Sequence, residues 1–179
     1  TVDGGYSLST NGTTWFAGVV GGTDSLANLT TDGGGVSFAG NVTTTGNQSF
    51  GGEATLVGDT TFTGDDVSIS GLDGGGFDVE FSATKKTTID ANAYSVANVA
   101  DLTVSGDVGL NGTIATTGNQ SYGGDVGLLG PTALTAGAGA ISLGVYGEVE
   151  GASHTLTLGD ANQTGPVTLG GASAVTLGG

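Results

Sequence analysis

The sequence of 179 residues contains no cysteine, no methionine and no arginine, and it has only two lysines, two prolines and one histidine. Without cysteine, no disulfide can hold the fold, and cysteine usage says nothing about the redox compartment. With so few basic side chains, the chain lacks most of the groups that activate catalytic nucleophiles. No run of about 18 apolar residues occurs, so no segment is predicted to span a membrane.

Glycine, threonine and acidic residues are abundant instead. The chain has 38 glycines and 28 threonines, and its 17 acidic residues give a formal net charge of −15. Because glycine and β-branched residues form helices poorly, this composition favours short strands separated by tight turns. The 36% of apolar residues is enough for a folded core. The negative charge argues against nucleic acids and anionic membrane surfaces as partners.

One stretch of the chain is written twice. Residues 44–56 read TTGNQSFGGEATL, and residues 116–128 read TTGNQSYGGDVGL. When residues 42–64 are aligned with residues 114–136, 12 of the 23 positions are identical, at a constant offset of 72. Self-similarity of this kind is typical of a structural repeat rather than of an active site.

A shorter period lies inside the repeat. Large apolar residues recur at multiples of six positions, and Gly-Asn and Gly-Gly pairs between them suit tight turns. Three such sides make a coil of roughly 18 to 20 residues, so four coils of about 18 account for the offset of 72. Phe50 and Tyr122 are therefore predicted to occupy equivalent places, four turns apart. The apolar positions are Phe38, Phe50, Leu56 and Phe62 in one copy, and Leu110, Tyr122, Leu128 and Leu134 in the other.

We therefore predict an all-β fold, a parallel β-helix (β-solenoid) of about nine coils of 18–20 residues with three short strands per coil. One domain covers residues 1–179, with the internal repeat in 25–73 and 95–145 and less regular ends at 1–20 and 146–179. Alternation in residues 77–81, FDVEF, places aromatic residues and Val79 inside and acids outside. Residues 90–102 contain little glycine and form the only stretch where a helical turn is expected.

The phrases GGT at 21–23, LTTDGGG at 29–35 and TTGNQSFGGEATL at 44–56 carry a resemblance to known repeats. Residues 18–145 resemble the repeats of very large bacterial surface proteins of the filamentous-haemagglutinin and autotransporter-adhesin type. The resemblance implies a right-handed β-helix that is exported and displayed on the cell surface or released. The secretion-domain signature of such proteins is not visible, so the resemblance implies an internal stem segment.

Candidate catalytic residues are few, and we expect no enzyme activity. The single histidine, His154, needs a nucleophile within reach, and the sequence GASHTL around it gives no sign of one. A glycoside hydrolase needs two suitably spaced carboxylates. A cluster of acids that could supply such a pair is expected by chance among 17; it comprises Asp65, Asp66, Asp73, Asp78 and Glu80.

No catalytic, cofactor or metal site is predicted. Ca²⁺ is the one cofactor considered, with Asp32 and Asp65-Asp66 as candidate ligands, but solvated turn acids explain these residues better. The only cationic pair, Lys85-Lys86, is expected in a turn or at a rim. Trp15-Phe16 suits either an exposed platform for sugar or, preferably, a plug that seals the first coil. Seven Asn-X-Ser/Thr triplets, expected by chance in such a repeat, begin at Asn11, Asn28, Asn41, Asn47, Asn111, Asn119 and Asn162.

The sequence favours a structural function: an adhesive or fibre-forming rod segment of a large extracellular bacterial protein, secreted to the cell surface. Two alternatives stay open, a carbohydrate-binding or carbohydrate-cleaving β-helix and an ice-binding solenoid. The chain starts without Met and ends in strand rhythm without a polar cap, so both ends are expected to be interior. The expected partners are copies of itself stacked head to tail or neighbouring coils of a longer parent chain, and a polysaccharide or another cell surface.

Overall fold

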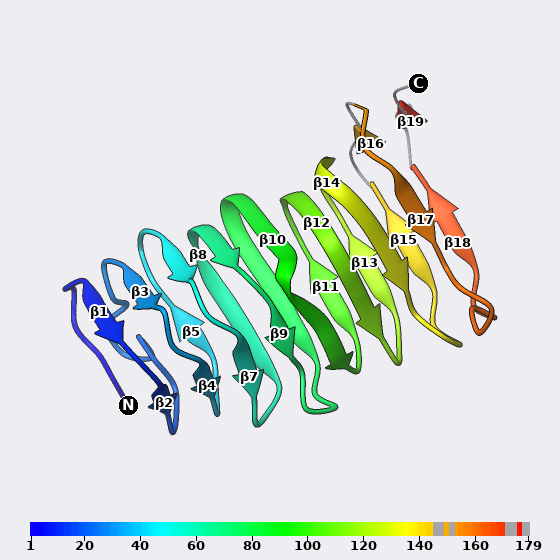
Figure 1. Ribbon diagram of the computed structural model, residues 1–179. Helices are drawn as coiled ribbons and strands as arrows, with labels where there is room; N and C mark the ends of the chain where they lie inside the picture. The colour runs from blue at the N-terminus through cyan, green and yellow to red at the C-terminus, as the bar shows by residue number, and fades with distance from the viewer. Residues whose placement is uncertain (145–148, 151–152, 171–174, 177–179) are drawn as a thin grey trace.

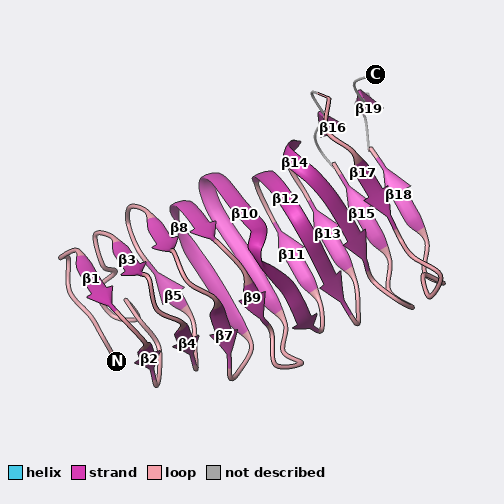
Figure 2. Cartoon of the chain, in the orientation of Figure 1, coloured by secondary structure: helices cyan, strands magenta, loops and turns pink. Residues whose placement is uncertain are grey.

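The computed structural model describes residues 1–144, 149–150, 153–170 and 175–176, and its elements are strands (Figures 1 and 2). Within these ranges there is no helix that could cross a membrane. In the described part of the chain, nineteen strands form one sheet in which every pairing is parallel, wound as a solenoid with β1 and β18 toward opposite ends. The predicted β-solenoid with three strands per coil is confirmed.

The coils stack into three flat faces, which we name A, B and C. Face A contains β1 (Leu8–Asn11), β3 (Leu29–Asp32), β6 (Gln48–Phe50), the second half of β8 (Thr60–Ile69), the middle of β10 (Val79–Val99), the first halves of β12 (Asp107–Thr116) and β14 (Val126–Thr135), β16 (Val149–Glu150) and β19 (Val175–Thr176).

Face B contains β2 (Thr14–Phe16), β4 (Val36–Phe38), β7 (Ala54–Leu56), β9 (Leu72–Asp73), the ends of β10, β12 and β14, and β17 (Leu156–Leu158). Face C contains β5 (Val42–Thr43), the starts of β8 and β10, β11 (Leu102–Val104), β13 (Gln120–Tyr122), β15 (Ile141–Leu143) and β18 (Val167–Leu169). The bridges Val2↔Val20 and Val20↔Val42 extend face C toward the N-terminus.

The pairing register gives the number of turns. Along face A, seven successive pairings lead from Leu8 to Val149, and one more reaches Val175. The chain therefore makes slightly fewer turns than the nine predicted. There are fewer turns because some coils contain more residues than predicted. Val108 pairs with Val126, as expected for a coil of the predicted length, but Val149 pairs with the more distant Val175.

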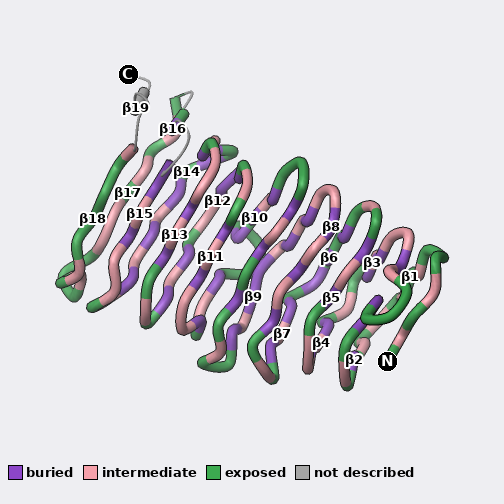
Figure 3. Tube along the Cα trace, turned by 180° about the vertical axis from the view of Figure 1, so that it is seen from behind, coloured by how far each residue is buried: buried purple, intermediate pink, exposed green. Residues whose placement is uncertain are grey.

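The core is a continuous ladder of inward side chains. Along most of the strands, buried and less buried residues alternate, as the banding of the tube in Figure 3 shows. Phenylalanines from all three faces meet in the interior, with Phe38 from face B at 5.1 Å from Phe50 of face A and 5.2 Å from Phe62 of face C between ring centroids. Phe62 stacks in turn on Phe81, at 5.3 Å and 12°. Such contacts add to the burial that holds successive coils together.

The two copies of the repeat do not lie on the same face, so the predicted equivalence of Phe50 and Tyr122 is wrong. Phe50 pairs with Ile69 on face A, whereas Tyr122 pairs with Val104 on face C. The copies are three turns and two further sides apart. One long coil between the two copies is responsible. More residues separate Leu72 from its register partner Val96 than separate Ala54 from its partner Leu72, and the excess is about the length of one side.

The duplicated segment nevertheless builds the same corner twice. In the first copy, the Gln48 side-chain amide donates to Thr63 O at 2.8 Å and to Val42 O at 3.3 Å. In the second, the Gln120 amide donates to Thr135 O at 2.8 Å and to Ile114 O at 3.2 Å. The motif therefore specifies a local corner structure and not a fixed position in the coil. Its first copy forms the corner between faces C and A, and its second copy forms the corner between faces B and C.

The helical turn expected within residues 90–102 is absent. Residues 90–99 belong to β10, and β11 begins at Leu102. Both edges of this part of β10 are paired, because Val96 aligns with Leu72 on one side and with Ile114 on the other. These backbone pairings override the local composition. A register shift between Ala91 and Val96 leaves Tyr94 at a bulge.

Candidate functional site

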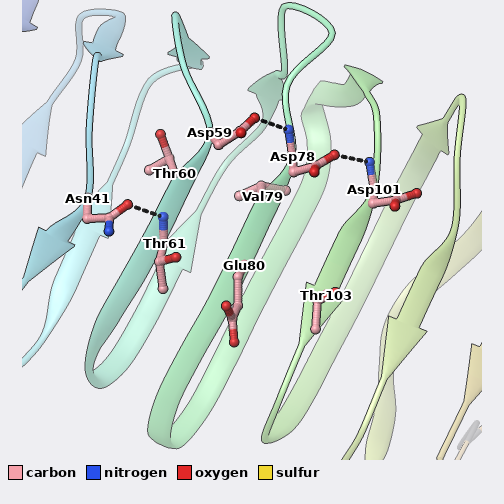
Figure 4. Close-up of a pocket in the computed structure, with 9 residues that line it drawn as sticks. All are labelled: Asn41, Asp59, Thr60, Thr61, Asp78, Val79, Glu80, Asp101 and Thr103. Atoms are coloured by element: carbon pink, nitrogen blue, oxygen red, sulfur yellow. Dashed lines mark hydrogen bonds between the residues drawn. The ribbon is translucent and has the colours of Figure 1, made fainter.

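A groove runs along the corner where face B turns into face C (Figure 4). It has a volume of about 550 Å³ and opens to solvent across four successive coils. Its lining is almost entirely polar and acidic. The lining residues are Asn41, Asp59, Thr60, Thr61, Asp78, Val79, Glu80, Asp101 and Thr103.

Carboxylate side chains form a hydrogen-bonded ladder in this groove. Asp59 Oδ1 accepts from the Asp78 backbone N–H at 3.1 Å, and Asp78 Oδ1 accepts from the Asp101 N–H at 3.0 Å (Figure 4). Asp101 accepts in the same way from the Asn119 N–H. Each side chain thus binds the backbone of the next coil at the same corner, directly before the strands of face C begin. The ladder satisfies backbone donors that would otherwise lack a partner in the protein.

This arrangement is better suited to holding coils together than to catalysis. One oxygen of each of Asp59, Asp78 and Asp101 is committed to a backbone N–H. Glu80 accepts from the Ser105 hydroxyl at 3.2 Å. No histidine, lysine or arginine is among the described residues that line the groove, so it offers no base or cation beside the carboxylates. What it offers a ligand is a row of exposed negative charge.

The acids that the sequence suggested as a catalytic pair are dispersed. Asp78 and Glu80 line the groove, but Asp73 lies on face B beside Thr55. Asp65 and Asp66 lie at the corner between faces C and A, where the register shifts from Ala83 to Lys86. Proximity in sequence therefore did not predict proximity in the solenoid. The groove instead gathers acids separated by one coil.

The lysine pair lies within strand β10, where β10 passes from face C to face A, and not in a turn as predicted. Lys85 Nζ is 2.7 Å from Asp65 Oδ2, and Asp65 also accepts from the Thr84 hydroxyl at 2.8 Å. The hydrogen bond from Lys85 lowers the pKa of Asp65, and the same bond raises the pKa of Lys85. Because the Lys85 side chain is exposed and Asp65 is only half-buried, this pair contributes little to stability.

The candidate Ca²⁺ ligands are not brought together. Asp32 is exposed at the end of β3 on face A, and Asp65 is paired with Lys85. Within the described part of the chain, no group of three or more His, Cys, Asp or Glu side chains could hold a metal ion. His154 is half-buried in the turn before β17 and does not line the acidic groove.

Trp15 and Phe16 lie on opposite sides of the sheet. Phe16 is 6% exposed and stacks on Phe38 at 5.5 Å, whereas Trp15 is 70% exposed. Phe16 therefore packs in the core, whereas Trp15 lies outside and is not part of the expected plug. Alternation along β2 separates the two side chains, since adjacent strand residues point to opposite sides of a sheet.

The sequence reasoning missed Asp59 and Asp101 as groove residues. A signal was present, because Asp59, Asp78, Asp101 and Asn119 recur at a spacing close to one coil. No protein-family model, no curated protein and no solved structure matches the chain.

Proposed function

We propose that this chain is a structural rod segment of a large extracellular bacterial surface or fibre protein, with an adhesive rather than a catalytic role. The observation that carries the proposal is the use of polar side chains as connections between coils. Gln48 and Gln120 are each 1% exposed and bind carbonyl groups of neighbouring strands, and Asp59, Asp78 and Asp101 bind the next coil at the surface. Hydrogen bonds of this kind between successive coils suit a spacer or stalk.

The surface composition also supports an extracellular stalk. Outward positions in successive coils hold small hydroxyl side chains in register, such as Ser9, Thr30 and Ser49 on face A. With a formal net charge of −15, this surface stays soluble and repels other acidic surfaces. The resemblance of residues 18–145 to adhesin repeats points in the same direction.

Exposed inward positions suggest a partner for the rod. Val167 and Leu169 of β18 are 40% and 41% exposed, whereas their partners Ile141 and Leu143 in β15 are buried. We propose that a further coil covers these side chains, either from a second copy stacked head to tail or from a longer parent chain. Light scattering over a range of concentrations separates the two sources. Mass that grows with concentration supports stacking of copies, and a monomer at every concentration contradicts stacking of copies.

The ice-binding alternative receives less support. It requires Thr-X-Thr on the same face of every coil. Thr61-X-Thr63 lies on face C and Thr155-X-Thr157 lies at face B, and the position paired with Thr61 in the next coil is Glu80. A carbohydrate-cleaving function is disfavoured because three of the four groove carboxylates are bound to backbone N–H groups and Glu80 is bound to the Ser105 hydroxyl.

The rod proposal is tested by location and by shape. Antibodies against these 179 residues should label intact cells of the producing organism, whereas labelling only after permeabilisation would contradict a surface location. Small-angle X-ray scattering should show an elongated particle, since seven turns at about 4.8 Å place Leu8 and Val149 about 34 Å apart along the axis. Incubation with polysaccharides should release no new reducing ends.

A further inference from the structure

Trp15 is an exposed aromatic side chain on the outer surface of face B. Its neighbour Phe16 is buried, and Thr14 is half-buried, so the indole stands on the solvent side of the sheet. A coil stacked on either side of β2 would extend the sheet but would leave this side chain facing outward. A large, rigid, exposed aromatic with an N–H donor is suited to contact with a ligand.

The register continues from Trp15 into a row of small polar side chains. Trp15 pairs with Ser37, Ser37 with Thr55, and Thr55 with Asp73. We call Trp15, Ser37, Thr55 and Asp73 the face B strip. At about 4.8 Å per coil, its three steps span about 14 Å along the rod. β2, β4, β7 and β9, which carry these residues, follow one another along one side of the solenoid (Figure 1).

A second exposed aromatic lies in the coil after Asp73, at the bulge of β10 beside Gly71. Tyr94 is 44% exposed and packs against Gly71, where a Cβ would lie 2.2 Å from the Tyr94 Cβ. Gly71 precedes Leu72 and Asp73 in the same coil. The Asp73 carboxylate is held in place, because its Oδ1 accepts from the Gly75 N–H and from the Asn98 side-chain amide, both at 3.1 Å.

We propose that the face B strip binds a neutral glycan chain lying parallel to the rod axis. The apolar C–H face of a pyranose ring would stack on Trp15, and sugar hydroxyls would hydrogen-bond to Ser37, Thr55 and the fixed carboxylate of Asp73. Tyr94 would give a second contact in the coil after Asp73. The exposed Glu53 beside Thr55, together with the net charge of −15, disfavours anionic glycans.

This inference rests on the proposed function only in that it names the surface by which the rod adheres and the class of its ligand. The two fail in different ways. If the protein is not a rod, scattering shows it. If the strip is not a glycan site, a well-formed rod fails to bind sugar.

Trp15 is the only tryptophan in the chain, so tryptophan fluorescence reports on the strip alone. The protein is titrated with a panel of neutral hexasaccharides, namely cello-, chito-, manno-, xylo- and laminarihexaose, and with polygalacturonate as the anionic comparison. We expect a saturable change in Trp15 emission with at least one neutral hexasaccharide and none with polygalacturonate. No response to the whole panel, or an equal response to polygalacturonate, overturns the proposal.

Variants then assign the binding to the strip, with calorimetry as the readout. Trp15→Ala should weaken binding of the responding hexasaccharide at least tenfold, and Thr55→Ala severalfold. Tyr6→Ala is the matched control, because Tyr6 is 83% exposed and lies outside the strip. Wild-type affinity in Trp15→Ala, with circular dichroism unchanged, would refute the role of the strip, as would an equal loss in Tyr6→Ala.

Discussion

The two copies of the corner motif differ at one buried hydrogen bond, and that difference predicts unequal effects of the same substitution. The Tyr122 hydroxyl donates to Gln120 Oε1 at 3.1 Å. In the other copy Phe50 replaces the tyrosine, and Gln48 Oε1 is buried without a hydrogen-bond donor among the described residues. The two glutamine amide groups otherwise make matching bonds to a threonine hydroxyl and two backbone carbonyls.

Gln120→Leu should therefore destabilise the protein more than Gln48→Leu. Both variants remove the donor to the carbonyl groups. Only Gln120→Leu also strands the buried Tyr122 hydroxyl, which should cost about 1 to 3 kcal/mol more. Gln48→Leu additionally removes an unpaired buried oxygen, and this partly offsets its own cost.

The assay is urea unfolding followed by circular dichroism, with midpoints and slopes compared for both variants. The double variant Gln120→Leu/Tyr122→Phe completes a cycle, and it should recover most of the extra loss because no stranded hydroxyl remains. Equal losses in Gln48→Leu and Gln120→Leu, or no recovery in the double variant, would show that the Tyr122 bond does not distinguish the corners.

Three further outcomes follow from the packing. Burial raises the pKa of Tyr122. The stability that the protonated hydroxyl contributes is therefore complete below the unfolded-state pKa of about 10, and it is lost above that pH by at most about 1.4 kcal/mol per pH unit. In urea titrations at alkaline pH, Tyr122→Phe should lack this part of the pH dependence. Phe38→Ala removes a fully buried ring that contacts three other rings and should cost about 3 to 5 kcal/mol in chemical denaturation, and a cost under about 1 kcal/mol would contradict the core assignment. Gly52→Ala places a Cβ 2.0 Å from Gly34 O of the neighbouring coil and should lower the melting temperature, whereas Gly58→Ala, whose nearest such contact is 3.8 Å, should leave it nearly unchanged.

The local structure could be predicted from the sequence because short-range chemistry determines it. The period of six, the turn glycines and the alternation in residues 77–81 all follow from what one side of a coil needs to bury. The helical turn expected in residues 90–102 failed for the converse reason. Pairing with two neighbouring coils is invisible in local composition, and it holds these residues in β10 and β11.

The face on which a distant residue lies could not be predicted, because small differences in the length of each side accumulate along the chain. The extra length between Leu72 and Val96 shifts every later residue around the coil, so Tyr122 is on face C instead of face A. The acidic groove was not predicted for the same reason. Only the lengths of the individual coils show that its residues lie at the same corner. The exposure of Trp15 could be predicted only by knowing which side of β2 faces outward. The residues before β2 do not alternate clearly enough between apolar and polar to show this.

The central claim is the parallel coil-to-coil register, and paired cysteines test it most directly in a chain that has no native cysteine. Ser49 and Ser68 face outward in adjacent coils and are register partners, so their Cα atoms lie about 4.8 Å apart, within the usual range for a disulfide. Ser121, the counterpart of Ser49 in the repeat, lies on face C. Mild oxidation should give an intramolecular disulfide in Ser49→Cys/Ser68→Cys and none in Ser49→Cys/Ser121→Cys. Failure of the first pair to cross-link, or intramolecular cross-linking of the second, would contradict the solenoid register described here.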